Sequence, residues 1–223
     1  MDVEIISLFR KYFLGPFNES ILKRARERKF LNIRYTQLRD FAFDKHHRVD
    51  DRPYGGGPGM VLKAEPASRA IRHVRREDSY VIYLSPQGKT LNASKCRQLA
   101  EKSHLILLCG HYEGIDERII VKEVDEEISI GDYVLTNGAL AAIVLLDAVS
   151  RFIPGVLGNK EAAKEDSFEK GIFDCPHYTR PEVFEGLTVP KVLLTGNHME
   201  IAAKRKEWAI AKTKSIRPDL FEG

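Results

Sequence analysis

Short apolar segments alternate with segments of helical periodicity through most of the chain, and few folds accommodate this order. Strands are expected at residues 3–8, 31–35, 80–84, 105–109 and 128–130. Helices are expected after an Asn18 N-cap, at residues 65–76, from an Asn92 N-cap to about 102, at residues 115–121 and from Ala139 onward. The alternation predicts an α/β fold in which helices cover the faces of a parallel sheet.

Three of the expected strands run into loops that combine glycine with polar residues, at residues 85–89, 110–114 and 130–138. Ligands of open α/β sheets bind outside the carboxyl ends of the strands, and glycine lets the backbone approach a ligand closely. A single loop of this kind is more often a simple turn, but three together favour a shared pocket. Residues 128–154, which join the third loop to a long apolar helix ending near Arg151, are the strongest candidate for the active site.

Several common phosphate and catalytic motifs are excluded by spacing. The GKT at residues 88–90 lacks the P-loop glycine five residues earlier, where Tyr83 stands, and the glycine run at 55–59 lacks the next glycine of a dinucleotide fingerprint at Met60. No glycine-rich turn follows the first strand, which argues against a Rossmann-type methyltransferase. The histidines show no ligand spacing, and no G-x-S-x-G elbow is present, so neither a metal site nor a serine hydrolase is predicted.

Composition indicates a soluble globular protein. Of 223 residues, 43% are hydrophobic and 30% charged, and the net charge of +3 permits an anionic partner without requiring one. The three cysteines form no C-x-x-C pair, which fits a reduced cytoplasmic setting. The first residues resemble a strand more than a signal peptide, and the apolar run at 139–146 is too short to span a bilayer, so no membrane association is expected.

A domain boundary is expected near residue 158, where the apolar signal gives way to small and charged residues. We expect a first domain at residues 1–158, a mobile linker at 159–170, and a small domain at 171–223 with a basic helix from an Asn197 N-cap to about 212. The basic face of such a helix is more often simply exposed to solvent than used to bind nucleic acid. A linker carboxylate such as Asp166 would ordinarily face solvent, whereas Arg151 must find an anionic partner or a surface.

Seven segments together resemble the bacterial tRNA (guanine-N1)-methyltransferase family. They are DRPYGGGPGM, YLSPQGKTL, LLCGHYEGIDERI, EISIGDYVLTNG, RFIPGVLGN, EDSFEKGIFDCPHYTRPEVFEG and VPKVLLTGNH, in this order. The resemblance implies a SPOUT-type parallel-sheet fold with a deep C-terminal trefoil knot and a small, mainly helical C-terminal domain that binds tRNA. It also implies a homodimer with an active site shared between subunits. The implied reaction transfers a methyl group from S-adenosylmethionine to N1 of the guanosine immediately 3′ of the tRNA anticodon.

The resemblance also assigns residues. Asp166 is the implied general base, Arg151 the support for the guanine and its O6, and Glu113 a residue that orients the methionine end of the cofactor or a magnesium ion. The residues implied to hold S-adenosylmethionine are Tyr83, Leu84, Ser85, Pro86, Gln87, Gly88, Gly110, Tyr112, Glu113, Ile130, Gly131, Asp132, Tyr133, Val134, Leu135, Asn137 and Gly138. Those implied to contact the substrate are Ser167, His177, Tyr178 and Arg180.

The chain departs from the family pattern at Asn137, Ala139 and Ala141, where glycine, glutamate and proline are usual, and at His111, where arginine is common. Asn137 is expected to tolerate a left-handed turn. Two other functions stay open: a related knotted methyltransferase with another RNA target, and a non-catalytic RNA-binding relative.

Overall fold

The structure, a computed structural model, describes residues 1–158 and 166–221. Its chain divides into two compact units, Met1–Gly158 and Asn159–Gly223. Residues 159–165, which form the first part of the expected linker, lie outside the described residues. No helix in the described ranges combines the length and the apolar character that crossing a membrane requires.

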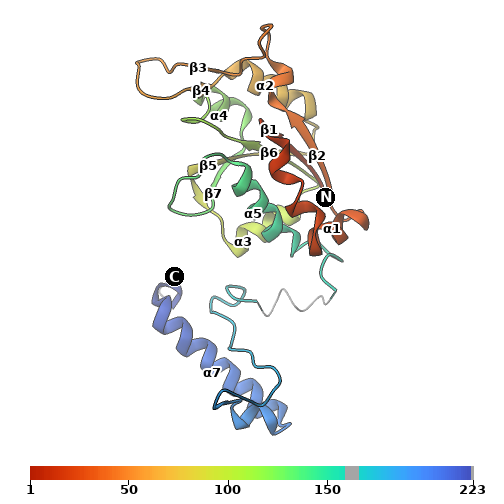
Figure 1. Ribbon diagram of the computed structural model, residues 1–223, viewed down its shortest axis with the longest axis vertical. Coiled ribbons are helices and arrows are strands. Elements are labelled where there is room, and N and C mark those ends of the chain that lie inside the picture. Colours follow the sequence, from red (N-terminus) through yellow and green to blue (C-terminus); the bar gives the residue numbers. More distant parts are fainter. Residues whose placement is uncertain (159–165, 222–223) are drawn as a thin grey trace. The chain divides into compact units, whose positions relative to one another are not determined.

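A five-stranded parallel sheet occupies the middle of the first unit (Figure 1). Its strands are β1 (Asp2–Ser7), β2 (Asn32–Gln37), β5 (Ser79–Thr90), β6 (His104–Cys109) and β7 (Glu126–Ser129). They lie in the order β2-β1-β6-β5-β7, and every neighbouring pair is parallel. The predicted α/β fold with a parallel sheet is thereby confirmed.

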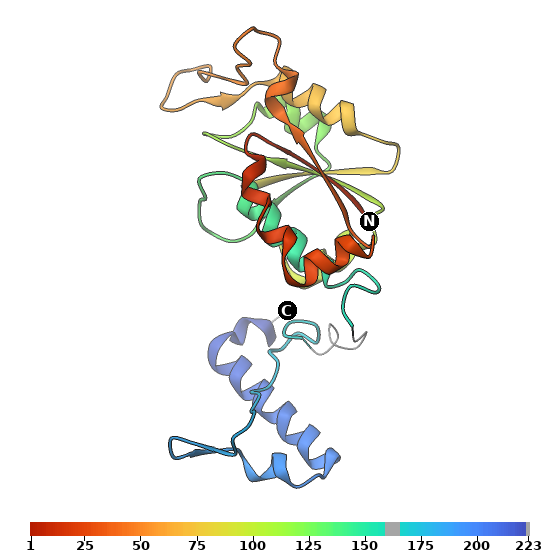
Figure 2. The ribbon, with the colours of Figure 1, turned by 45° about the vertical axis from the view of Figure 1, so that its right-hand side comes forward.

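Helices cover both faces of this sheet (Figure 2). One face packs against α1 (Ser20–Glu27), α3 (Ala93–Ala100) and α5 (Ala139–Ser150), and the other against α2 (Ala64–Val74) and α4 (Glu117–Glu123). Side chains of β6 alternate between the two cores: Leu105 and Leu107 enter the first, and Ile106 and Leu108 the second. This period of two is the strand pattern that makes a continuous apolar run bury both of its faces.

Short elements complete the first unit. They are the 3-10 helices η1 (Arg10–Phe13), η2 (Pro16–Asn18) and η3 (Leu38–Phe41), and the antiparallel pair β3 (Asp50–Asp51) and β4 (Val61–Leu62). The prediction of Asn18 as an N-cap is wrong, because Asn18 ends η2 and its side chain donates to the Leu14 carbonyl, while Glu19 precedes α1. The helix expected at 115–121 starts at Glu117, because Asp116 caps it by accepting from the Arg118 amide.

The second unit is built around α7 (His198–Ile216), which begins after the predicted Asn197 cap. The other elements are β8 (Val183–Phe184), β9 (Leu187–Thr188), η4 (Lys191–Leu194) and η5 (Pro218–Phe221). The Phe173 amide donates to Thr213 Oγ1 at 2.8 Å. This hydrogen bond holds the segment around Phe173 against α7. The hairpin of β8 and β9 was not predicted, because each strand is only two residues long and both are exposed.

Candidate cofactor-binding site

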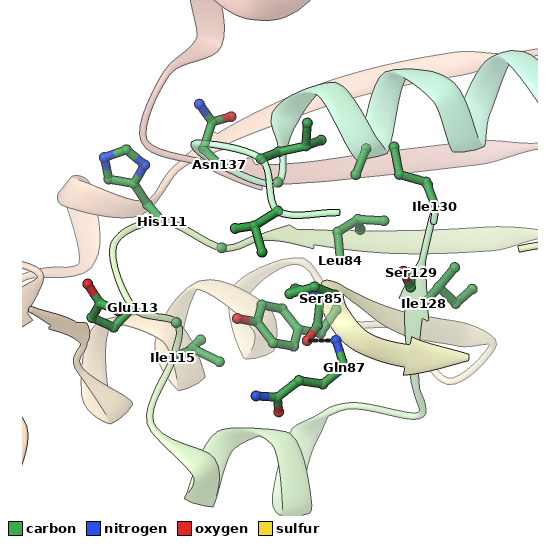
Figure 3. Close-up of a pocket in the computed structure, with 18 of the residues that line it drawn as sticks. Leu84, Ser85, Gln87, His111, Glu113, Ile115, Ile128, Ser129, Ile130 and Asn137 are labelled. Atoms are coloured by element: carbon green, nitrogen blue, oxygen red, sulfur yellow. Dashed lines mark hydrogen bonds between the residues drawn. The ribbon is translucent and has the colours of Figure 1, made fainter. Parts of the chain in front are cut away.

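The three glycine-containing loops meet in one pocket of about 310 Å³, at the carboxyl ends of β6 and β7 and beside residues 83–87 of β5 (Figure 3). This volume lies at the lower end of the range of roughly 300–1,000 Å³ that is typical of small-molecule sites. Every residue expected to hold a cofactor lines the pocket except Gly88 and Asp132. The lining also includes His111 and Thr136, which belong to the expected loops, and Ile115, Glu117 and Ile120, which were not expected.

Gly110 and Gly138 bring two of the loops into direct contact. The Gly138 amide donates to the Gly110 carbonyl at 2.8 Å, and His111 forms an isolated antiparallel bridge with Asn137. A Cβ on Gly138 would lie 2.9 Å from the Gly110 nitrogen and 3.0 Å from the Cys109 Cα. Glycine is therefore required at Gly138 by the close approach of two backbones rather than by its φ angle.

Asn137 acts differently from expectation. It is not among the residues with positive φ, so the expected left-handed turn is wrong. Its side-chain oxygen instead accepts from the Ala139 amide at 2.9 Å, at the start of α5. A free N–H at a helix start needs an acceptor, and an asparagine side chain supplies one locally. α5 begins at Ala139 as predicted, despite the absence of the usual proline at Ala141.

The loop that follows β7 is folded on itself around Gly131. Ser129 Oγ lies 3.0 Å from the Gly131 carbonyl and 3.2 Å from its amide, and the Tyr133 hydroxyl donates to the Ile130 carbonyl at 3.1 Å. A Cβ on Gly131 would meet the Tyr133 ring at 2.5 Å. These contacts place Ile130 and Tyr133 in the pocket wall.

The loop at residues 85–88 interrupts β5 instead of ending it. Leu84 and Lys89 both pair with Ile128 of β7, so the residues between them leave the sheet and β5 resumes to Thr90. The prediction that this strand ends at residue 84 was therefore too short. Gly88 does not line the pocket because it lies against β7, where a Cβ would come within 2.5 Å of the Glu127 backbone.

The buried ionisable side chain of the pocket lining, Tyr83, is held neutral. Burial, reinforced by the negative charge of Glu127, raises the pKa of Tyr83 to about 12. Burial alone raises the pKa of Cys109, which lies next to the lining residue Gly110, to about 12. Neither group can accept a proton near pH 7, so neither supplies a base.

The glycine run at residues 55–59 leads into the pocket rim, which spacing had not suggested. The Glu113 amide donates to the Met60 carbonyl at 3.0 Å, and the Leu62 amide to the Gly114 carbonyl at 2.9 Å. A Cβ on Gly59 would meet the Glu113 side chain at 2.3–2.7 Å. A second, open hollow adjoins the pocket here and shares Ile115 and Glu117 with it.

The expected catalytic and substrate residues lie outside the pocket lining. Arg151 follows the last turn of α5 as its C-cap. Asp166 belongs to the second unit, where the Glu169 amide donates to its carbonyl at 3.3 Å. Ser167 Oγ accepts from the Asp174 amide at 2.9 Å, and Tyr178 and Arg180 are exposed. The approach of these second-unit residues to the pocket stays a prediction, as does the mobility of the linker.

Asp174, Cys175 and His177 bring three potential ligand atoms within 4.8 Å of one another, a grouping that sequence spacing had not suggested. Asp174 is already engaged, because Oδ1 accepts from the Cys175 amide and Oδ2 lies 2.8 Å from His177 Nε2. Burial and the Asp174 charge raise the pKa of the Cys175 thiol, which opposes the thiolate that a metal would need. The trio is better explained as a hydrogen-bonded turn.

Comparison with known proteins decides the family. The family model described as tRNA (Guanine-1)-methyltransferase TrmD matches residues 1–223. The chain belongs to this family. The predicted resemblance is thereby confirmed, and the pocket described above is that of a TrmD-family chain.

Several relatives of the chain share more than half of its residues. A protein of Protochlamydia amoebophila (strain UWE25) named tRNA (guanine-N(1)-)-methyltransferase is 70% identical over 221 residues, which cover 99% of this chain and 100% of the relative. Proteins of the same name from Chlamydia pneumoniae and Chlamydia abortus are 60% and 58% identical over 99% of this chain. The chain spans 61% and 62% of the length of these two relatives.

Proposed function

We propose that the chain transfers a methyl group from S-adenosylmethionine to N1 of the guanosine immediately 3′ of the tRNA anticodon. The observation that carries the proposal is the pocket in which the three loops of a TrmD-family chain converge. Its position at the carboxyl ends of β6 and β7 is the position where ligands of open α/β sheets bind. A cytoplasmic location and a tRNA partner follow from the proposed substrate.

The lining suits an adenosyl ligand with a charged tail. Leu84, Ile130 and Leu135 supply apolar surface for a flat base, and the loop backbones supply amides and carbonyls. Nδ1 of His111 is buried without a hydrogen-bond partner among the described residues, so a polar group of a ligand could pair with it. Glu113 on the rim is the candidate for the methionine ammonium or for a magnesium ion. When bound, S-adenosylmethionine would supply a methyl group already activated on a sulfonium.

Asp166 is the proposed base. Guanine N1 carries a proton and is a poor nucleophile, so a carboxylate must take that proton as the N1–methyl bond forms and the sulfur–methyl bond breaks. Tyr83, the buried ionisable side chain of the pocket lining, is held neutral and does not supply this base. If tRNA draws Asp166 to the pocket, the base arrives only with the correct substrate, which is selectivity by induced fit.

Arg151 is the proposed support for the reacting guanine. Loss of the N1 proton shifts negative charge onto O6, and a guanidinium stabilises that charge in a site from which water is excluded. α5 carries Arg151 at its end and starts in the cofactor loop, so one rigid element would connect the two ligands. We further propose that the active site is shared between the subunits of a homodimer, and that the first unit carries the family's deep trefoil knot.

A methyl-transfer assay on paired tRNA transcripts tests the proposed function. The transcripts differ only in G or A immediately 3′ of the anticodon, and transfer is expected to G alone. Replacement Asp166→Asn should lower kcat by roughly 100-fold or more without weakening cofactor binding, since general bases contribute about 10²–10⁴-fold. Glu200→Gln, an exposed acid of the same unit, is the matched control. Transfer to both transcripts, or to neither, would contradict the proposal.

Mixed protomers test the shared site. Asp166→Ala and Arg151→Ala chains are each expected to be inactive, and mixing them should restore part of the activity if the two residues act from different subunits. Calorimetry with S-adenosylmethionine separates the remaining alternatives. Cofactor binding without transfer to this tRNA position would favour another RNA target, and absence of cofactor binding would favour a non-catalytic RNA-binding relative.

A further inference from the structure

A groove of about 700 Å³, separate from the cofactor pocket and from the open hollow beside it, runs along the free edge of the sheet at β2. Five arginines line it: Arg10, Arg26, Arg34, Arg75 and Arg76. They come from four separate parts of the first unit, namely η1, α1, β2 and the segment after α2. β2 and β7 are opposite edges of the sheet, so this groove is distinct from the cofactor pocket.

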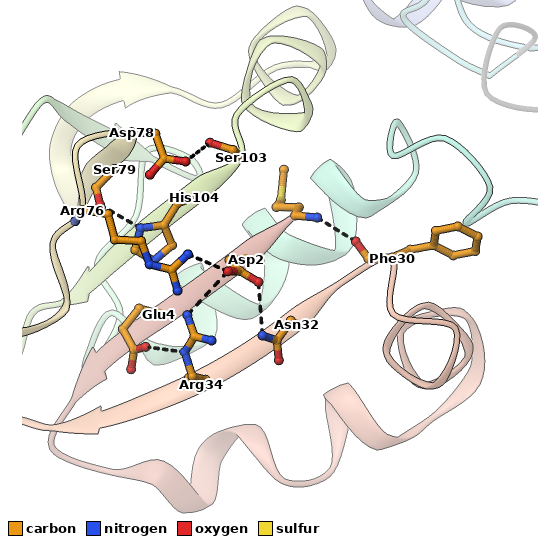
Figure 4. Close-up of polar contacts among 11 residues, drawn as sticks. Asp2, Glu4, Phe30, Asn32, Arg34, Arg76, Asp78, Ser79, Ser103 and His104 are labelled. Atoms are coloured by element: carbon orange, nitrogen blue, oxygen red, sulfur yellow. Dashed lines mark hydrogen bonds and ion pairs between the residues drawn. The ribbon is translucent and has the colours of Figure 1, made fainter.

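The groove has an excess of positive charge. Glu4 is the one carboxylate in its lining, and it is buried, accepting from Thr36 Oγ1 at 2.6 Å and from Arg34 Nε at 3.2 Å. Asp2 lies beside the groove and contacts both Arg34 and Arg76 (Figure 4). A third carboxylate, Glu123, lies outside the lining and accepts from Arg75 Nη1 at 2.9 Å. The five arginines therefore outnumber the three carboxylates that engage them by two. Arg34 and Arg76 are still 43% and 45% exposed, so solvent reaches both guanidiniums.

Protection of the sheet edge explains only part of this arrangement. A charged residue on an edge strand discourages pairing with another chain, and Arg34 on β2 suits that purpose. Arg10, whose guanidinium lies 5.3 Å from the centre of the Tyr35 ring, comes from a different element. Arg75 and Arg76 follow α2. The convergence of arginines from four segments on one groove indicates a binding surface for an extended anion.

We propose that this groove binds the ribose-phosphate backbone of the tRNA whose anticodon loop occupies the cofactor side, an inference that rests on the proposed function. Guanidinium groups present planar forks that match phosphate oxygens. Across the sheet, four strand spacings of about 4.8 Å separate β2 from β7, or roughly 20 Å. A single tRNA is large enough to contact both sites. Backbone contacts of this kind position the substrate and carry no sequence information.

Salt dependence of tRNA binding tests the groove. Fluorescence anisotropy with labelled tRNA would be measured from about 50 to 200 mM salt. The variant Arg10→Gln/Arg76→Gln should bind roughly 5- to 40-fold more weakly near 0.1 M salt, and its slope of log K against log salt should be smaller by about 1–2. Arg10→Glu alone, which leaves the Asp2 ion pairs intact, should weaken binding in the same direction.

The matched control is Arg24→Gln/Arg28→Gln, which removes the same charge from exposed positions on and just after α1 outside the groove lining. The control should keep the slope within about 0.5 of the parent protein, and S-adenosylmethionine affinity should be unchanged in all variants. Equal slopes in the groove and control variants, or no tRNA binding by the parent protein, would overturn the proposal. If the groove variants change the slope but the parent protein transfers no methyl group, the tRNA-binding role of the groove is supported and the proposed reaction is rejected.

Discussion

At the scale of single residues, the pocket depends on backbones that approach more closely than a side chain permits. Gly138 lies on the Gly110 backbone, and a Cβ on Gly110 would meet the Tyr83 hydroxyl at 2.9 Å. Tyr83 in turn is buried and neutral. The pocket wall is therefore a layer of close contacts between loops, and small additions of volume should change its shape.

Gly138→Ala is expected to separate the two loops, because the new methyl group would come within 3.0 Å of backbone atoms that cannot rotate away. Overpacking of this kind costs about 1–3 kcal/mol. S-adenosylmethionine affinity should fall by roughly 10-fold or more, measured by calorimetry. Gly15→Ala is the control, since nothing lies within 4 Å of a Cβ there and its φ of −76° suits alanine. Equal affinities in both variants would contradict this account of Gly138.

At the scale of secondary-structure elements, a buried carboxylate joins α4 to α2. Glu123 is 4% exposed and accepts from Ser68 Oγ at 2.9 Å, Arg72 Nε at 2.8 Å and Arg75 Nη1 at 2.9 Å. Two donors from α2 and one from its C-cap residue Arg75 thus bind Glu123, the last residue of α4. This arrangement fixes α4, whose first residue Glu117 lines the cofactor pocket.

Glu123→Gln should lower the free energy of unfolding by about 1–3 kcal/mol, because an amide cannot accept from all three donors. The lower part of that range is favoured, since the Arg72 side chain is 56% exposed and solvent screens its charge. Urea unfolding measures the effect. Glu101→Gln, at an exposed position after α3, should change stability by less than about 0.5 kcal/mol. If the two variants were equally stable, the proposed link between α2 and α4 would be wrong.

The amino end of β6 carries a buried histidine that should make stability depend on pH. His104 is 0% exposed, and its Nδ1 lies 2.7 Å from Ser79 Oγ. Burial, then the positive charge of Arg76, lower the pKa of His104 below its ordinary value of 6.5, against a smaller opposing effect of Asp78. Below about pH 6.5 the unfolded chain binds a proton that the folded chain does not, so folding stability falls as pH falls.

Urea unfolding at pH 7.5 and pH 5.5 measures this dependence. The parent protein should be less stable at pH 5.5, and His104→Gln should show a smaller difference between the two pH values. The exposed histidine His46 provides the control His46→Gln, which should keep the parent dependence. A His104→Gln protein with the full pH dependence would place the responsible group elsewhere.

At the scale of the whole molecule, α5 presents apolar side chains on its outer face as well as its inner one. Leu145 and Val149 are buried in the core, whereas Leu140 and Val144 are 43% and 48% exposed. Leu140 and Val144 lie one helical turn apart and form an exposed apolar strip that ends at the exposed Asp147. Neighbouring exposed apolar side chains of this kind mark interaction surfaces. The outer face of α5 is therefore the surface that we expect a second copy of the chain to cover.

Leu140→Asp/Val144→Asp should give a monomer by light scattering, because two carboxylates would have to be buried in the interface. Methyl transfer should be lost with the dimer if the active site is shared. Val121→Asp, at an 80%-exposed position on α4, should leave the dimer intact. A dimer that survives the double replacement would place the interface on another surface.

The sequence by itself determined the parallel α/β architecture, the caps at Asn92 and Asn197, the start of α5 and the three loops of the pocket. These features follow from side-chain periodicity and from hydrogen bonds between near neighbours, which are readable over a few residues. Asn18 was misassigned because its side chain found the Leu14 carbonyl instead of a helix N–H.

Only the tertiary structure decided the rest. The strand order, the excursion of β5 at residues 85–88, the contact of Gly59 with Glu113 and the arginine groove all join segments far apart in the chain. Gly88 was assigned to the pocket, yet its role is to admit the β7 backbone. Such contacts depend on which strands pair and how closely two backbones pack, and no local pattern of residues encodes either.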